Sequence, residues 1–172
     1  MNNAHTAYDN SDERRNAFDP GLHPALFDGV LSRRVLAFLI DAFVILILMV
    51  IASMAIAVIG VITFGLGWLL YAILLPLVAL PYIALSLGGY SAATPGMKMM
   101  GLEMRLWYGA KPYAMLAIMH SLLFWFGNTI LTPLIILVGL FTRRKQLLHD
   151  MILGTMIMDS DALRQLEGYD QF

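Results

Sequence analysis

The sequence contains no cysteine, which excludes disulfides and cysteine nucleophiles. Charge is also scarce, because only 13% of the 172 residues are Asp, Glu, Lys or Arg, whereas 59% are hydrophobic. A soluble domain carries about 25% charged residues, so this balance indicates a protein whose surface largely faces lipid. Of the twelve acidic residues, only Asp41 lies inside a long apolar run.

Recognisable catalytic motifs are missing as well. There is no glycine-rich phosphate loop and no serine nucleophile elbow. His5 and His23 are isolated, and no two histidines show the spacing of metal ligands. The sequence therefore predicts a protein that is not an enzyme, has no metal or other cofactor, and does not bind nucleic acid.

Two apolar runs have the length of membrane-spanning helices. The first, at 33–59, begins with the pair Arg33 and Arg34. The 25 residues after this pair contain one ionisable side chain, Asp41. As a helix it would extend about 37 Å, enough to cross a hydrocarbon core of about 30 Å. The second, at 67–87, contains Pro76 and Pro81, which predict a kink or local unwinding.

The third apolar run, 112–141, allows two topologies. A single helix of 30 residues would extend about 45 Å and would place the basic cluster 143–145 on the far side of the membrane. A break at 127–129 and Pro133 would instead let the chain return to its starting side, which the positive-inside rule favours. The returning arrangement, which we prefer, divides the run into helices at about 113–127 and 129–141.

Basic residues set the expected orientation. They precede the first run at Arg14, Arg15, Arg33 and Arg34, and they follow the second at Lys98, Arg105 and Lys111. The connection between the two runs has no charge, so we expect a multi-pass protein of a bacterial inner membrane with a cytoplasmic N-terminus. The cluster 143–145 is expected to contact anionic lipids on the same side.

The remaining chain completes the expected fold. Residues 102–107 and 155–158 alternate as strands do, and their pairing would form a short cytoplasmic two-stranded β element. We expect an all-α membrane protein, a small bundle of three to four transmembrane or re-entrant helices with that β element. The domain would occupy 21–159, between a disordered cytoplasmic tail at 1–20 and a polar C-terminal tail at 160–172.

Asp41 is the centre of the functional prediction. A carboxylate at the centre of a membrane helix costs about 2.5 to 3.5 kcal/mol and needs a partner or a wet cavity. His120 lies at a similar expected depth, about 12 Å against about 10 Å for Asp41, so the two could pair and exchange a proton. Arg34 lies two helical turns before Asp41 on the same face. The polar path could continue through Asn128, His149 and Asp150. The alternative is that these polar groups have a structural role and hold the helices together.

Thr94, Pro95 and Gly96 have the composition of a turn, because Pro fixes one backbone angle and Gly tolerates a positive one. Lys98 follows it and could meet a lipid phosphate or Asp150. A loop anchored at the membrane interface is the simpler interpretation.

Three motifs in order resemble the RDD family of bacterial membrane proteins, named for one arginine and two aspartates. RRVLAFLID supplies Arg34 and Asp41, TPGMKMMGLEMR supplies Thr94, Pro95, Gly96, Gly101 and Leu102, and RRKQLLHDMILGT supplies His149, Asp150, Gly154 and Thr155. The resemblance extends from about residue 26 to 158. Many relatives have lysine directly after Thr-Pro-Gly, where this sequence has Met97 and then Lys98.

The resemblance implies a fold more firmly than an activity. The family has no settled biochemistry; transport of an unidentified ligand is suggested, and some members look like sodium/proton antiporters. The first hypothesis is therefore a small transporter-like protein, coupled to a monovalent cation or proton, that would need a homo-oligomer to enclose a pathway. The alternative is a membrane interaction or assembly module in which the buried charges fix helix packing.

Overall fold

The structure is a computed structural model that describes residues 18–169, apart from the side chains of residues 128–138 and 140. The predicted tail at 1–20 therefore falls almost entirely outside the described residues. In chain order the elements are η1 (Pro24–Leu26), α2 (Val30–Ile62), η2 (Leu66–Ile73), α3 (Leu74–Leu87), α4 (Pro95–Met99), β1 (Leu102–Leu106), α5 (Ala114–Phe141), α6 (Leu148–Leu153), β2 (Thr155–Asp159) and α7 (Ser160–Tyr169), where η denotes a 3-10 helix.

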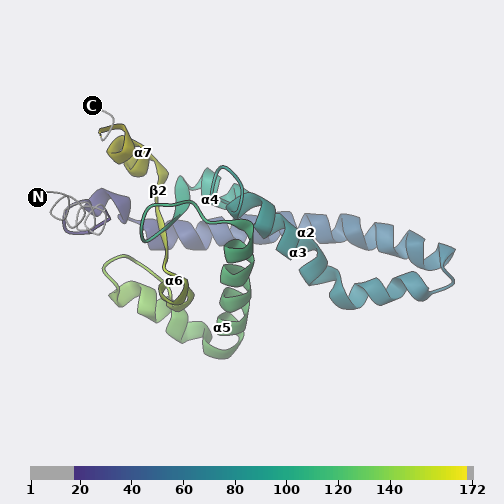
Figure 1. Cartoon of the computed structure of the whole chain (residues 1–172). Coiled ribbons are helices and arrows are strands. Elements are labelled where there is room, and N and C mark those ends of the chain that lie inside the picture. Colours follow the sequence, from purple (N-terminus) through teal and green to yellow (C-terminus); the bar gives the residue numbers. More distant parts are fainter. Residues whose placement is uncertain (1–17, 170–172) are drawn as a thin grey trace, which may run out of the picture.

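The two predicted spans form a long helical hairpin that projects from the rest of the molecule (Figure 1). α2 is 33 residues long, and η2 and α3 return along it. Both segments are apolar and long enough to cross a membrane, and very few of their side chains are buried within the chain. This exposed apolar surface suggests association with lipid, as the composition predicted.

The second span is locally unwound at its start, as its prolines predicted. Residues 66–73 form η2 rather than α-helix, and the α-helical geometry begins only two residues before Pro76. Pro76 has no amide hydrogen, and its ring would clash with the carbonyl four residues earlier in an α-helix. Near the hairpin tip, Gly60 lies so close to Trp68 that a Cβ at Gly60 would lie 1.9 Å from its indole ring.

The third apolar run is one bent helix rather than the two predicted helices at 113–127 and 129–141. α5 starts against the end of α3, where a Cβ at Gly88 would lie 2.4 Å from Ala114. It bends near its middle in Figure 1 and comes back to the start of α2, where a Cβ at Gly139 would lie 3.3 Å from the Leu31 side chain. The run thus bends without ending, and it returns to the end of the hairpin from which it began (Figure 1).

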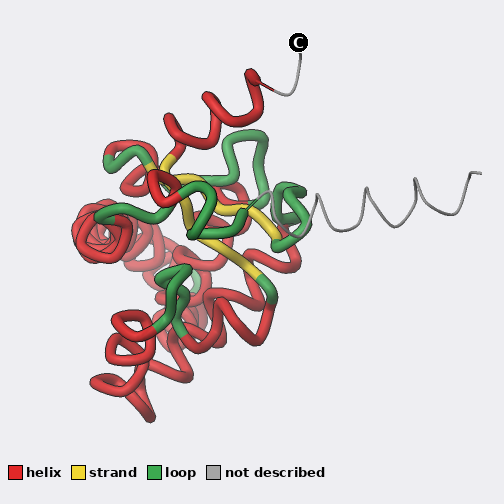
Figure 2. Tube along the Cα trace, turned by 90° about the vertical axis from the view of Figure 1, so that its left-hand side faces the viewer, coloured by secondary structure: helices red, strands yellow, loops and turns green. Residues whose placement is uncertain are grey.

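The predicted strand pairing is confirmed. β1 and β2 are antiparallel, with Leu102 opposite Asp159 and Leu106 opposite Thr155 (Figure 2). On one face of the sheet, Met104 and Ile157 pack against α2, α3 and α5; on the other, Met156 and Met158 pack against η1 and α7. The sheet thereby joins the helical hairpin to a small second layer.

The stretch predicted as a polar, weakly helical tail at 160–172 forms the helix α7 over 160–169, the part of it that the structure describes. Leu163 is completely buried and packs with Leu26 and Met158. Asp159 caps the helix, because its Oδ1 accepts hydrogen bonds from the amides of Asp161 and Ala162 at 2.9 and 2.8 Å. Its Oδ2 binds Arg33 at 2.7 Å, which ties α7 to the start of α2.

Asp159→Ala is expected to release α7. Loss of the cap should cost about 1 kcal/mol, and loss of the half-exposed ion pair should add less than about 1 kcal/mol. Tryptic cleavage at Arg164, which lies within α7, should therefore accelerate several-fold, whereas Asp161→Ala, which leaves the cap intact, should change it little. Equal cleavage rates in both variants would contradict this assignment.

Low pH should weaken α7 in the same way as Asp159→Ala, because it protonates the Asp159 carboxylate. Burial raises the pKa of Asp159, but the amides of Ala162 and Asp161 and the Arg33 guanidinium lower it further, so the net pKa is below the ordinary 3.8. A carboxylate with a depressed folded-state pKa stabilises the fold above its unfolded value and loses that effect as the pH falls. Protection of α7 should therefore weaken only as the pH falls below about 4.

Candidate functional site

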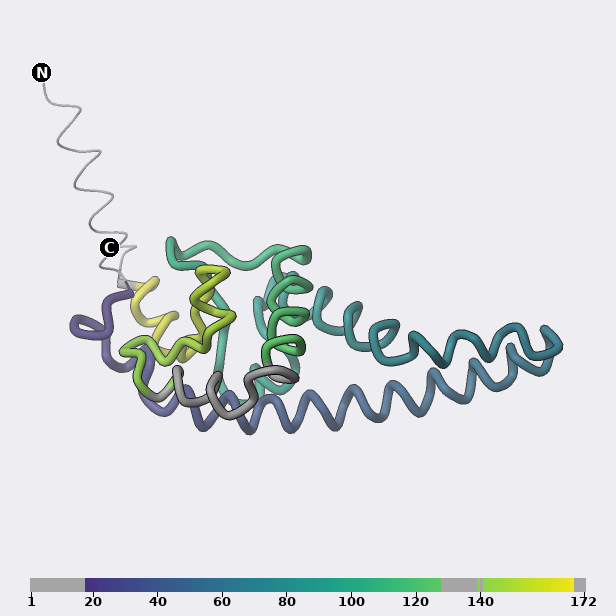
Figure 3. The backbone as a smooth tube through the Cα atoms, turned by 90° about the horizontal axis from the view of Figure 1, so that it is seen from below, coloured from purple at the N-terminus to yellow at the C-terminus, as the bar shows by residue number. Residues whose placement is uncertain are grey.

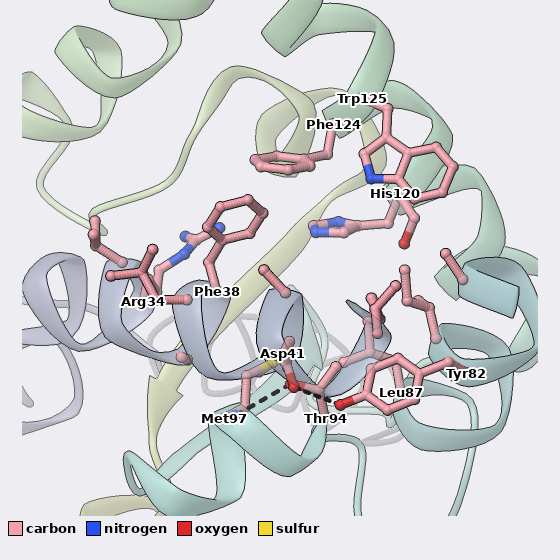
Figure 4. Close-up of a pocket in the computed structure, with 18 of the residues that line it drawn as sticks. Arg34, Phe38, Asp41, Tyr82, Leu87, Thr94, Met97, His120, Phe124 and Trp125 are labelled. Carbon is pink, nitrogen blue, oxygen red and sulfur yellow. Dashed lines mark hydrogen bonds between the residues drawn. The ribbon is translucent and has the colours of Figure 1, made fainter. Parts of the chain in front are cut away.

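The polar residues of the apolar helices gather around one cavity of about 950 Å³ (Figure 4). Its walls come from α2, α3 and α5, and most of them are aliphatic or aromatic. Seven polar side chains reach the cavity: Arg34, Asp41, Tyr82, Thr94, His120, Ser121 and His149. Ser121 donates to the carbonyl of Ala117, and the other six belong to two separate clusters, one around Asp41 and one around Asp150.

Asp41 is bound entirely by neutral donors. Its Oδ1 accepts hydrogen bonds from the Tyr82 hydroxyl at 2.7 Å and the Gly96 amide at 2.8 Å, and its Oδ2 accepts one from the Thr94 hydroxyl at 2.5 Å. Thr94 also caps α4, because its Oγ1 accepts a hydrogen bond from the amide of Met97. The Thr-Pro-Gly motif is thus the segment that satisfies the carboxylate of α2.

This contact requires glycine at position 96. A Cβ there would lie 2.3 Å from the carbonyl oxygen of Ala37 and 2.8 Å from Cγ of Asp41. Contacts this short force atoms to move. The backbone of α4 therefore approaches α2 as closely as it does only because Gly96 has no side chain.

The second cluster is a buried ion pair. Nη1 of Arg34 lies 2.6 Å from Oδ2 of Asp150, with side-chain exposures of 9% and 0%. The same guanidinium nitrogen donates to the carbonyl of Lys145, and the amide of Leu147 donates to Asp150 at 2.9 Å. Burial raises the pKa of Asp150, but the positive charge and hydrogen bond of Arg34 outweigh it and bring the pKa to about 2. Asp150 is therefore ionised at neutral pH.

Two histidines face the other oxygen of this carboxylate. Nδ1 of His120 lies 3.6 Å and Nε2 of His149 lies 3.4 Å from Oδ1 of Asp150, and the two rings meet edge to face at 4.6 Å. Thr155 Oγ1 lies 3.4 Å from both Asp150 Oδ1 and His120 Nδ1. Burial lowers the pKa of His149, so this imidazole is neutral at pH 7.

The predicted pairing of Asp41 with His120 is wrong, although the prediction that Asp41 needs a polar partner is confirmed. Asp41 binds Tyr82 and the Thr94 turn, whereas His120 lies beside Asp150. Figure 4 places His120 across the cavity from Asp41 and Tyr82.

The structure also locates the other predicted site residues. Lys98 is exposed and does not pair with Asp150, whose cationic partner is Arg34. The side chain of Asn128 lies outside the described residues. Gly101 and Gly154 have φ angles of 63° and lead into the two strands, so their role is conformational.

Sequence reasoning missed Tyr82. Its hydroxyl completes the set of donors around Asp41, but a tyrosine in an apolar run is usually interpreted as a packing residue. The second span contains two tyrosines, Tyr71 and Tyr82. A list of the side chains in this span that can donate a hydrogen bond would therefore have included Tyr82.

A known family matches most of the chain. The RDD family matches residues 29–154, a span that contains Arg34, Asp41 and Asp150 and, apart from Thr155, the residues of both clusters described above. No curated protein and no solved structure matches the chain. Because the match covers well over half of the sequence, the chain belongs to the RDD family of membrane proteins.

Proposed function

We propose that this protein is a small transporter-like protein of the bacterial inner membrane, with its N-terminus in the cytoplasm, whose cavity takes up a cation in exchange for protons. The observation that carries the proposal is the convergence of polar groups from α2, α5 and α6 on one cavity of about 950 Å³ with otherwise apolar walls. Ligand sites in proteins typically combine such walls with a few fixed polar groups. Buried ionisable residues in membrane segments commonly mark ion pathways.

The cluster around Asp150 suits this role better than Asp41 does. Asp41 receives hydrogen bonds from three neutral donors, which leaves it little capacity to bind a cation. Asp150 has one oxygen bound to Arg34, and its other oxygen faces two imidazoles that line the cavity. Imidazole is the side chain whose ordinary pKa is nearest neutrality, so His120 and His149 are the proposed proton-exchanging groups.

A second copy of the chain would complete the pathway. The described residues contain two helices long enough to cross a membrane. The cavity they form with α5 is not fully enclosed by the chain, so a homo-oligomer would be needed to enclose a route for an ion.

Proton movement in proteoliposomes tests the proposal. Wild-type protein should acidify or alkalinise the lumen, as reported by a pH-sensitive dye, when a gradient of Na⁺, K⁺ or Co²⁺ is imposed. His120→Gln should abolish the response, and Arg33→Gln, which affects a residue outside the cavity lining, should keep it. A wild-type protein that gives no response to any of these cations over a range of pH would contradict transport.

One observation favours the alternative of a packing or assembly module. Asp41 is fully satisfied by hydrogen bonds, as expected of a group that holds α2, α3 and α4 together. Asp41→Asn replaces one acceptor oxygen with a donor and leaves a buried donor unpaired, at a cost of about 1 to 3 kcal/mol. We expect a lower melting temperature in detergent. If flux is also absent in the wild type, the assembly role is the better account.

A further inference from the structure

We propose that His120, His149 and Asp150 form a binding site for a divalent transition-metal ion such as Zn²⁺, with an open coordination position on the side of the cavity. Their ligand atoms all lie within 4.8 Å of one another, and all three residues are buried. Two imidazoles and one carboxylate are a ligand set that binds zinc or iron(II) while leaving room for another ligand. The inference rests on the proposed function in that it names the cation, but the binding itself is measurable without transport.

The spacing of the three groups fits metal ligands better than hydrogen-bond partners. The distances of 3.4 and 3.6 Å from Asp150 Oδ1 to the two histidine nitrogens exceed the about 2.7 to 3.2 Å of normal hydrogen bonds. With metal bonds of about 2.0 to 2.1 Å, two ligand atoms of a tetrahedral ion lie about 3.3 to 3.4 Å apart. The two distances from Asp150 Oδ1 are therefore already close to those between metal ligands, whereas the two imidazole nitrogens, which lie up to 4.8 Å apart, would have to move toward each other to bind one ion.

His149 adds a second observation. Its Nδ1 is buried and has no hydrogen-bond partner among the described residues, and its Nε2 lies beyond normal hydrogen-bond distance from Asp150. Buried polar groups are nearly always satisfied, and an exception often indicates a water or an ion. A metal bound at Nε2 would hold this loosely fixed nitrogen, and Nδ1 would then carry the proton and donate it to a water in the cavity that His149 lines.

Arg34 shapes the site in two ways. It binds Oδ2 of Asp150, which fixes the carboxylate and leaves Oδ1 for the metal, as outer partners of metal ligands commonly do. Its positive charge also opposes a dication, so an anion at the open position would strengthen metal binding. His120 and His149 line the cavity, which gives that anion access to the open position.

Cobalt binding tests the site on the full chain, purified in mild detergent without a histidine tag and freed of metal with EDTA. We expect about one Co²⁺ per chain with the visible absorption of a tetrahedral ion, displaced by Zn²⁺ but not by Mg²⁺. Loss of a residue that only hydrogen-bonds a metal ligand lowers metal affinity about 10- to 100-fold. His149→Gln and His120→Gln each remove a ligand itself, so each should weaken Co²⁺ binding by more than about 100-fold. His23→Gln, which changes a histidine distant in sequence from the cluster, should bind as the wild type does.

The outcomes separate this inference from the proposed function. Wild-type protein that neither absorbs with Co²⁺ nor gains thermal stability with Zn²⁺ would overturn the metal site, even if Na⁺ or K⁺ drives proton flux. Binding that His149→Gln and His120→Gln leave unchanged would overturn it as well. Specific Co²⁺ binding without flux of any ion would support the site and contradict transport.

Discussion

Arg34→Gln is expected to destabilise the protein by about 3 to 5 kcal/mol, because it leaves Asp150 charged and buried without its cationic partner. The Arg34 and Asp150 side chains are 9% and 0% exposed, so bulk solvent replaces little of the lost interaction. The variant should show a much lower melting temperature in detergent and reduced abundance in membranes.

The neighbouring arginine provides a matched control. Arg33 forms an ion pair with Asp159 of similar length, 2.7 Å, but with side-chain exposures of 29% and 21%. Arg33→Gln should therefore cost only about 1 kcal/mol or less. The double variant Arg34→Gln with Asp150→Asn should recover part of the lost stability, because it removes both charges together. Equal losses in the two single variants would contradict the distinction between a buried and an exposed pair.

Gly96→Ala should have the second large effect. The added methyl group would lie 2.3 Å from the Ala37 carbonyl, so α4 must move away from α2. That movement would lengthen the hydrogen bonds that Gly96 and Thr94 donate to Asp41. Overpacking alone costs about 1 to 3 kcal/mol, and the weakened hydrogen bonds to the carboxylate add to it.

Gly168→Ala is the control for this substitution, since a Cβ at Gly168 would have no atom within 4 Å. We expect its melting temperature to match or slightly exceed that of the wild type, because alanine favours helix. If Gly96→Ala has the same melting temperature as the wild type, the α2 and α4 backbones do not approach as closely as described.

The spans and the sheet were predictable because local patterns determine them. The run after Arg34 has one ionisable residue in 25, and a helix is the structure that satisfies such a backbone in lipid. The alternation at 102–107 and 155–158 likewise identified two strands whose backbone groups could hydrogen-bond to each other. A run long enough for both topologies, such as 112–141, was ambiguous because glycine and proline can bend a helix or end it.

The partners of Asp41 and Asp150 were not predictable in the same way. The estimate that brought His120 to the depth of Asp41 assumed that α5 runs alongside α2, but the first part of α5 crosses α2 at a steep angle (Figures 1 and 3). One donor to Asp41 is the amide of Gly96, and backbone donors are invisible in a list of side chains. The metal-ligand set was hidden for a related reason, because His120 and His149 are distant in sequence.

The proposed exchange of a cation for protons requires water to reach the cavity, and the absence of cysteine from the sequence allows a direct measurement. Ala42 lines the cavity, whereas Ala55 does not. Ala42 lies about 12 Å along α2 from Arg34, and Ala55 lies about 11 Å from Ile62, where α2 ends. We predict that a charged, membrane-impermeant thiol reagent modifies Ala42→Cys much faster than Ala55→Cys in intact membranes. Equally slow modification at both positions would mean that lipid fills the cavity, and would contradict the account.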